Sequence, residues 1–257
     1  MITTIDQAKH FLETGIFLEG QKIMTGGYAR RYGANVRVAK STEGAHKTWV
    51  PVCGLKVGNL MLEGGRLTVQ STSRVRLGAY LLETICGGRS DSLTAAYQGA
   101  DLNSALMVMR ATNELIDGMQ VTCHVRAGEE FLRTYWCGHR EGDQLGFLTT
   151  VTISGIEGEA SAADWGILHE IDLIKESDSS TIKELAKRIT GILDEALSEK
   201  SLKLYSIDLR FGRDGYGNIV LASSFLDPCW DIRDLNGNQI GPLQLLQMLV
   251  PERWSAD

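Results

Sequence analysis

The stretch from Thr181 to Asp234 constrains the fold of this chain more than any other part of the sequence. An amphipathic pattern predicts a helix from Thr181 to Lys200, with apolar residues on one face and charged residues on the other. Thr181 and Glu184 fit a capping box at its start. Apolar runs then predict strands over Leu204 to Phe211 and over Ile219 to Leu221. The stretch therefore predicts a helix followed by a β-hairpin.

Acidic side chains surround this hairpin. Asp214 lies in the glycine-containing turn between the strands, where we expect it to serve the turn itself. Asp208, Asp227 and Asp231 lie outside the turn. Many ATP-dependent enzymes hold metal-binding carboxylates on such a hairpin, and Mg²⁺ prefers carboxylate and phosphate oxygens. This interpretation makes Asp208, Asp227 and Asp231 catalytic candidates and Asp208 and Asp227 metal ligands; the alternative is that they only cap turns and face solvent.

The remaining segments alternate between β and helical patterns. We expect a short helix over Ile5 to Thr14, β structure from Gly20 to Ser73, and β structure again from Gln120 to Val151. Between the two β regions, Val75 to Gly118 is predicted to be mainly helical. This prediction rests on an apolar stripe at helical spacing, made of Leu102, Leu106, Met109, Leu115 and Ile116.

Small and polar residues over Gly155 to Ala163 predict a loop or a linker between lobes, and a Leu-rich helix containing Leu243, Leu245, Leu246 and Leu249 is expected to dock on the core. No internal repeat is evident. Together these patterns predict an α+β fold of two lobes. We expect residues 1–118 to form a β-rich N-terminal lobe with flanking helices and residues 119–257 to form a mixed α/β C-terminal lobe.

Composition narrows the functional classes. The net charge of −6 argues against a nucleic-acid partner. The five cysteines are scattered and never form C-x-x-C, which predicts reduced thiols in a cytoplasmic protein. No apolar run is long enough to span a membrane. The Walker A, G-x-G-x-x-G and G-x-S-x-G motifs are all absent, which removes the commonest P-loop, Rossmann and hydrolase interpretations.

Two groups of basic residues are candidates for binding phosphate. Gly26, Gly27, Arg30 and Arg31 form a glycine-flanked basic turn, in which backbone amides approach phosphate oxygens and the arginines neutralise them. The alternative is an exposed hairpin with solvated arginines. Arg126, at a strand end, can clamp a carboxylate or a phosphate; the alternative for it is a salt bridge with Glu129 or Glu130.

Three segments, taken in order, resemble the SAICAR synthetase family, the purine-biosynthesis ligases that join aspartate to a carboxylated imidazole ribotide using ATP. Residues 27–32 (GYARRY) resemble the family's loop over the nucleotide phosphates, and residues 121–138 (VTCHVRAGEEFLRTYWCG) resemble its V-V-V-R-N-x-A-A-G-S stretch. The helix and hairpin from Thr181 onward are similar to its V-D-F-K-L-E-F-G segment and the following strand. The resemblance implies a two-lobe SAICAR-synthetase-like fold with ATP and Mg²⁺ bound between the lobes.

The sequence departs from the family pattern at its chemical positions. With Phe211 and Gly212 in register, the family's Asp, Lys and Glu correspond to Ser206, Asp208 and Arg210. Its Asp-Glu pair corresponds to Ser223 and Ser224, its Pro-Asp to Asp227 and Pro228, an Arg of its closing loop to Asp231, and its substrate-contacting Gly-Ser to Gly128 and Glu129. Arg210 becomes a further candidate nucleotide ligand.

Two functions remain open at this point, beside a weaker one, a nucleic-acid role for the arginines of residues 26–37 and 74–89, which the net charge opposes. The first is a diverged ATP-dependent ligase or phosphotransferase that binds a nucleotide. The second is a catalytically silent descendant that binds a small molecule or a protein, or forms a homo-oligomer.

Overall fold

The computed structural model describes residues 36–40, 46–51, 69–87, 95–101, 106–110, 112–116, 118–135, 138–154, 160–214, 216–223, 225 and 229–250. The chain divides into two units. The first comprises Met1–Thr112, Ser224–Asp227 and Pro242–Asp257, and the second comprises Asn113–Ser223 and Pro228–Gly241. Within the described residues, no helix is long and apolar enough to cross a membrane.

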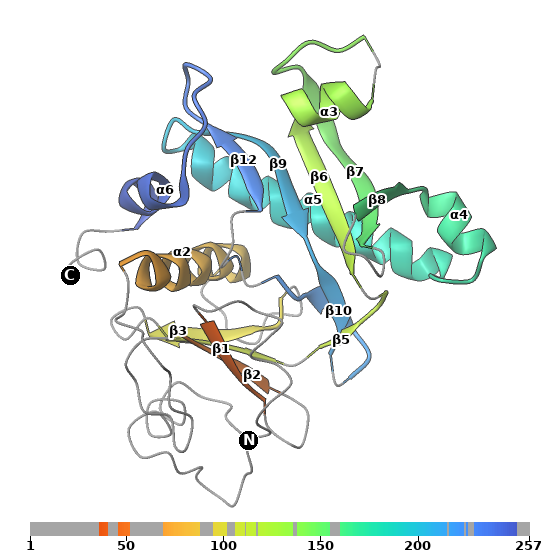
Figure 1. Ribbon diagram of the computed structural model, residues 1–257, viewed down its shortest axis with the longest axis horizontal. Helices are drawn as coiled ribbons and strands as arrows, with labels where there is room; N and C mark the ends of the chain where they lie inside the picture. Colours follow the sequence, from red (N-terminus) through yellow and green to blue (C-terminus); the bar gives the residue numbers. More distant parts are fainter. Residues whose placement is uncertain are drawn as a thin grey trace, which may run out of the picture. The chain divides into compact units, whose positions relative to one another are not determined.

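The first unit contains an antiparallel sheet with strand order β1-β2-β4-β3. Its strands are β1 (Val36–Lys40), β2 (His46–Pro51), β3 (Tyr97–Asp101) and β4 (Leu106–Arg110). Helix α2 (Val69–Cys86) contacts this sheet and also helix α6 (Pro242–Leu249), which comes from the far end of the chain (Figure 1). Leu245, Leu246 and Leu249 of α6 are buried, as expected of a docking helix, whereas Leu243 remains 42% exposed.

Two boundaries expected in this unit are wrong. Residues 106–110 form strand β4, although the apolar stripe through Leu106 and Met109 predicted a helix. The run Leu106-Met107-Val108-Met109 is continuously apolar, and such a short run fits a strand as well as a helix until its partners are known. Here β2 and β3 pair with it on either side. Conversely, β structure expected up to Ser73 gives way to α2 from Val69.

The second unit is built on a five-stranded antiparallel sheet of order β12-β9-β6-β7-β8. The strands are β6 (Met119–Arg126), β7 (Gln144–Ser154), β8 (Ala160–Ala163), β9 (Lys203–Leu209) and β12 (Trp230–Arg233). Short helices α3 (Glu129–Thr134) and α4 (Trp165–Glu170) connect them. The loop or linker expected over Gly155 to Ala163 is therefore wrong at its end, where β8 pairs with β7.

Helix α5 (Glu176–Ser198) covers one face of this sheet and contacts β6, β7 and β9 (Figure 1). Its predicted core face is confirmed, because Ile182, Ile189, Leu193 and Leu197 are buried. The predicted capping box is wrong. The helix begins at Glu176, and the Thr181 hydroxyl donates to the carbonyl of Ser177 inside it. Glu176 and Asp178 supply the negative charge that favours a helix start.

The predicted hairpin is confirmed only from Phe211 onward, because most of the strand expected over Leu204 to Phe211 is β9 of the five-stranded sheet. Strands β10 (Phe211–Arg213) and β11 (Ile219–Leu221) pair in the register Phe211↔Leu221, and β5 (Asn113–Glu114) completes a three-stranded sheet. All three β11 residues are buried, as an unbroken apolar run requires. Asp214 is a turn residue, as expected. Its carboxylate accepts hydrogen bonds from the backbone N–H groups of Tyr216 and Asn218.

Candidate functional site

Strand β6 presents two chemically different faces to its surroundings. Burial raises the pKa of the Cys123 thiol to about 11, and Thr190 and Lys187 of α5 oppose part of this rise. Cys123 therefore lies on the face of the sheet that α5 covers. Because side chains alternate along a strand, Thr122 and His124 lie on the opposite face. That second face carries the polar groups that could take part in chemistry.

Asp208 of β9 lies opposite Thr122 on this polar face, since the two residues are paired across the strands. The Thr122 hydroxyl donates to Asp208 Oδ1 at 2.6 Å. Burial raises the pKa of Asp208 above its ordinary value, and the hydrogen bond from Thr122 opposes part of this shift. The arrangement favours a carboxyl group that holds its proton more readily than a solvated aspartate.

His124 is the second buried titratable group on this face. Its Nε2 lies 3.0 Å from the Thr150 hydroxyl, and its ring packs against Phe131 with centroids 5.0 Å apart. Burial lowers the pKa of His124 from 6.5 to about 4, so the ring is neutral at physiological pH. Thr122, His124 and Thr150 were not predicted as site residues. The β alternation places them, but their partners depend on strand pairing that the sequence does not state.

Arg210 and Ser223 meet where β9 passes into β10. The backbone N–H of Arg210 donates to Ser223 Oγ at 2.7 Å, and the carbonyl of Arg210 accepts from the N–H of Ala222 at 2.7 Å. Ser223 is buried, whereas Arg210 is exposed. Two of the positions that the resemblance pairs with acidic residues of the family are therefore neighbours in space, and they carry a guanidinium and a hydroxyl group.

Asp231 is bound by an arginine of its own strand. Arg233 donates from Nε and Nη2 to the two carboxylate oxygens of Asp231, at 2.9 and 2.8 Å, and also pairs with Glu141. The guanidinium lies over the Tyr205 ring at 4.1 Å. Asp231 also lies against Gly128, where an added Cβ would be 3.1 Å from Oδ2. The predicted catalytic group is thus neutralised by a fixed cation.

Arg126 points toward α5. Its Nη1 donates to Asp194 Oδ1 at 2.8 Å and to the carbonyl of Leu204 at 2.5 Å. Its ion-pair partner is Asp194 rather than the Glu129 or Glu130 considered from the sequence, because a helix distant in the sequence packs beside the strand end. A role for Arg126 in nucleotide binding stays a prediction.

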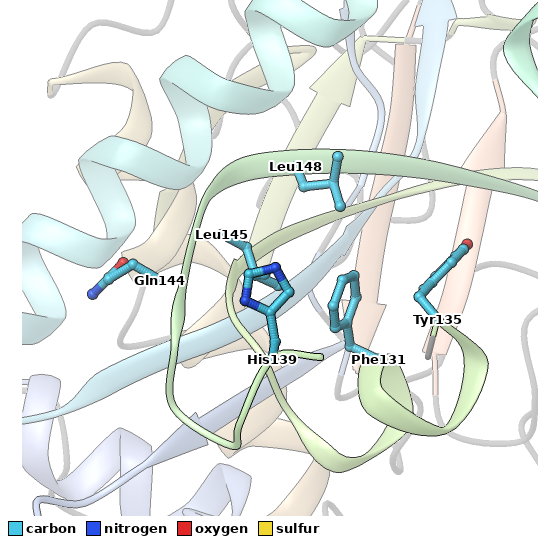
Figure 2. A pocket seen from close by; sticks show the side chains of 6 residues that line it. All are labelled: Phe131, Tyr135, His139, Gln144, Leu145 and Leu148. Carbon is cyan, nitrogen blue, oxygen red and sulfur yellow. The ribbon is translucent and has the colours of Figure 1, made fainter. Parts of the chain in front are cut away.

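A pocket of about 390 Å³ lies beside α3, lined by Phe131, Tyr135, His139, Gln144, Leu145 and Leu148. Figure 2 shows the rings of Phe131 and His139 next to one another, with Leu148 across from them. A bulge in β7 shapes this wall, since the pairing passes from His124↔Leu148 to Arg126↔Gln144. The predicted site residues that the structure describes do not line this pocket.

Several predicted site residues lie outside the described residues: Gly26, Gly27, Arg30, Arg31 and Asp227. Their assignments stay predictions. Among the residues that are described, no group of three His, Cys, Asp or Glu side chains could hold a metal ion. With Asp208 bonded to Thr122 and Asp231 bound by Arg233, the described carboxylates by themselves do not fit a magnesium site.

A search of curated proteins finds relatives of one kind. The phosphoribosylaminoimidazole-succinocarboxamide synthase of Clostridium tetani (strain Massachusetts / E88) is 24% identical over 186 residues, which span 72% of this chain and 81% of the relative. The enzyme of the same name from Listeria innocua serovar 6a is 34% identical over 64 residues, or 24% of this chain and 27% of the relative. A scan against protein-family models finds no match.

Solved structures of SAICAR synthetases share the fold of this chain. A SAICAR synthetase (Type-2) in complex with ADP aligns with a TM-score of 0.62 at 12% identity, covering 85% of this chain and 87% of that chain. The chain is a SAICAR synthetase homologue. The synthase of Ehrlichia chaffeensis gives a TM-score of 0.61 at 12% identity with the same two coverages. The Saccharomyces cerevisiae SAICAR synthase complexed with SAICAR gives 0.55 at 13% identity, over 87% of this chain and 80% of that chain. The SAICAR-synthetase-like fold expected from the sequence is thereby confirmed for this homologue.

Proposed function

We propose that this SAICAR synthetase homologue binds an adenine nucleotide and uses ATP as a diverged ligase or phosphotransferase. The observation that carries the proposal is a sequence match over 81% of the Clostridium tetani synthase, joined with the fold of a synthetase that binds ADP. In this proposal Gly26, Gly27, Arg30 and Arg31 hold the phosphates. Phosphoryl transfer depends mainly on positioning and on neutralising charge, so a changed set of side chains can still serve it.

Thermal denaturation with and without nucleotide tests this proposal. We expect 5 mM ADP or ATP, each with Mg²⁺, to raise the melting temperature. A ligand present at about 100 times its Kd stabilises the folded state by about 2.7 kcal/mol. For a chain of this size that is a shift of roughly 5–10 °C. GTP at the same concentration is the control for specificity. If neither adenine nucleotide raises the melting temperature, the proposal is wrong.

A second candidate is a catalytically silent descendant that binds a ligand or a protein partner, or forms a homo-oligomer. Arg210 beside Ser223 favours it, because the resemblance has acidic residues at both positions. Phosphate release from ATP separates the two candidates. Release in the presence of carboxylate and amine acceptors supports the enzyme, whereas nucleotide binding without turnover supports the silent descendant. Mass measurement in solution then shows whether the silent protein is an oligomer.

A cytoplasmic location belongs to the same proposal. Cys123 is a free, buried thiol, and reduced cysteines are typical of cytoplasmic proteins.

A further inference from the structure

The described aspartates around the hairpin are all engaged by other groups. Asp208 accepts from Thr122, and both oxygens of Asp231 accept from Arg233. Asp214 and Asp234 each accept from backbone N–H groups of their own loops. Mg²⁺ on a nucleotide is usually held by one or two carboxylates together with the phosphates. Asp231 would have to give up its ion pair with Arg233 before it could bind a metal ion.

The hairpin instead presents a cation. Arg210 is exposed, and its guanidinium forms no ion pair with any described residue. Its backbone is fixed on both sides by hydrogen bonds to Ser223 and Ala222. Its charge reaches Asp208, where it favours the ionised carboxylate. A guanidinium matches the oxygens of a phosphate group with two parallel hydrogen bonds and keeps its charge at any physiological pH.

We propose that nucleotide binding by this chain is independent of divalent cations, because the guanidinium of Arg210 supplies the positive charge that Mg²⁺ would otherwise supply. This inference rests on the proposed nucleotide binding and goes beyond it. Asp208 beside it is engaged by the hydroxyl of Thr122, and the charge of Arg210 acts on its carboxyl group. A polyphosphate that reaches this end of the hairpin therefore meets an exposed guanidinium without a metal ion.

Calorimetric titration of the full chain with ADP tests this inference. We expect the Kd in 5 mM EDTA to lie within about twofold of the Kd in 5 mM Mg²⁺. Arg210→Gln should weaken ADP binding about tenfold or more in EDTA, which corresponds to about 1.4 kcal/mol, the scale of one charge-assisted hydrogen bond. The matched control is Arg188→Gln, an exposed arginine on α5, which should leave the Kd unchanged.

A charge-reversal variant gives an independent reading. Arg210→Glu combined with Ser223→Asp places two carboxylates at neighbouring positions, and ADP binding should then require Mg²⁺. Circular dichroism and melting temperature confirm that the variant is folded, and Arg210→Gln alone decides the matter if it is not.

The outcomes separate the inference from the proposed function. Absence of ADP binding even with Mg²⁺ contradicts the proposed function. Binding that occurs only with Mg²⁺ leaves that function intact and overturns the inference, as a metal site completed by Asp227 would require. An unchanged Kd in Arg210→Gln overturns it as well.

Discussion

At the scale of single residues, the polar face of the second unit carries two buried titratable groups whose pKa values move in opposite directions. Burial raises the pKa of Asp208 and lowers that of His124. The physical cause is the same, because removal from water disfavours the charged form of either group. The face is therefore polar but holds less charge than its residue types suggest.

His124 should make the stability of the protein depend on pH. Its pKa of about 4 in the folded state lies below the ordinary value of 6.5, so the unfolded state binds the proton more readily. The stabilisation is complete above pH 6.5 and is lost as the pH falls toward 4. Between pH 7 and pH 5 this group should lower the free energy of unfolding by roughly 2 kcal/mol. Urea denaturation at both pH values measures it.

The variant His124→Gln should lack this part of the pH dependence while losing some stability at pH 7, because the amide cannot pack on Phe131 as the ring does. His139→Gln is the control, since His139 is exposed. An equal loss between pH 7 and pH 5 in wild type and His124→Gln would contradict the assignment.

Asp208→Asn should raise the free energy of unfolding at pH 7. The raised pKa means that Asp208 contributes stability below its unfolded pKa and that this contribution is lost as the pH rises through the folded value. Asparagine carries no charge to desolvate, and its carbonyl can still accept from Thr122. The gain should shrink as the pH is lowered and Asp208 takes up its proton. Chemical denaturation from pH 4 to pH 8 checks this, and a variant less stable than wild type at pH 7 would count against it.

At the scale of elements, two loops of the second unit have the same construction. Arg213-Asp214-x-x-Gly217-Asn218 and Arg233-Asp234-x-x-Gly237-Asn238 share one pattern, although no repeat was expected from the sequence. In each loop the Asn carbonyl accepts from the Asp N–H at 2.9 Å, and the glycine has a φ of 87°. A left-handed residue is needed there, which explains the glycine.

The two loops differ in burial, which leads to unequal effects of the same substitution. Asp214 is 4% exposed, and Asp214→Ala should cost about 1–3 kcal/mol of stability because the turn's N–H groups lose a buried acceptor. Asp234→Ala should cost less, since water replaces the carboxylate in the more open loop. Urea denaturation of the two variants side by side measures the difference. A larger loss in Asp234→Ala would show that burial does not set the cost.

Elements with a long regular pattern were predictable, and those defined by partners were not. The stripe of Ile182, Ile189 and Leu193 identifies α5 because a helix repeats its face over several turns. Strand β4 is too short for its apolar run to specify a period, so its assignment depends on β2 and β3. In the site, the sequence identifies Asp208 and Asp231 as candidate carboxylates but does not state their bonding partners. The bond of Asp208 to Thr122 depends on strand register, whereas Arg233 lies two residues from Asp231 on the same strand.

At the scale of the whole molecule, the fold could be recognised because three weak segments occur in the order of one family. The sequence match at 24% identity covers 72% of the chain, although the hairpin carries Arg210 and Ser223. Chemistry is less readable at this distance. A single exchange of an acid for an arginine changes which ions a site attracts, while the backbone hydrogen bonds around it stay in place.

Helix α6 belongs to the first unit but is synthesised last. It packs against α2, yet residues 242–249 are synthesised after the whole of the second unit. Domains of a growing chain generally fold as they leave the ribosome. The second unit can therefore fold while α2 still exposes the surface that α6 will cover. Premature termination before Pro242 therefore leaves the first unit without the helix that packs on α2.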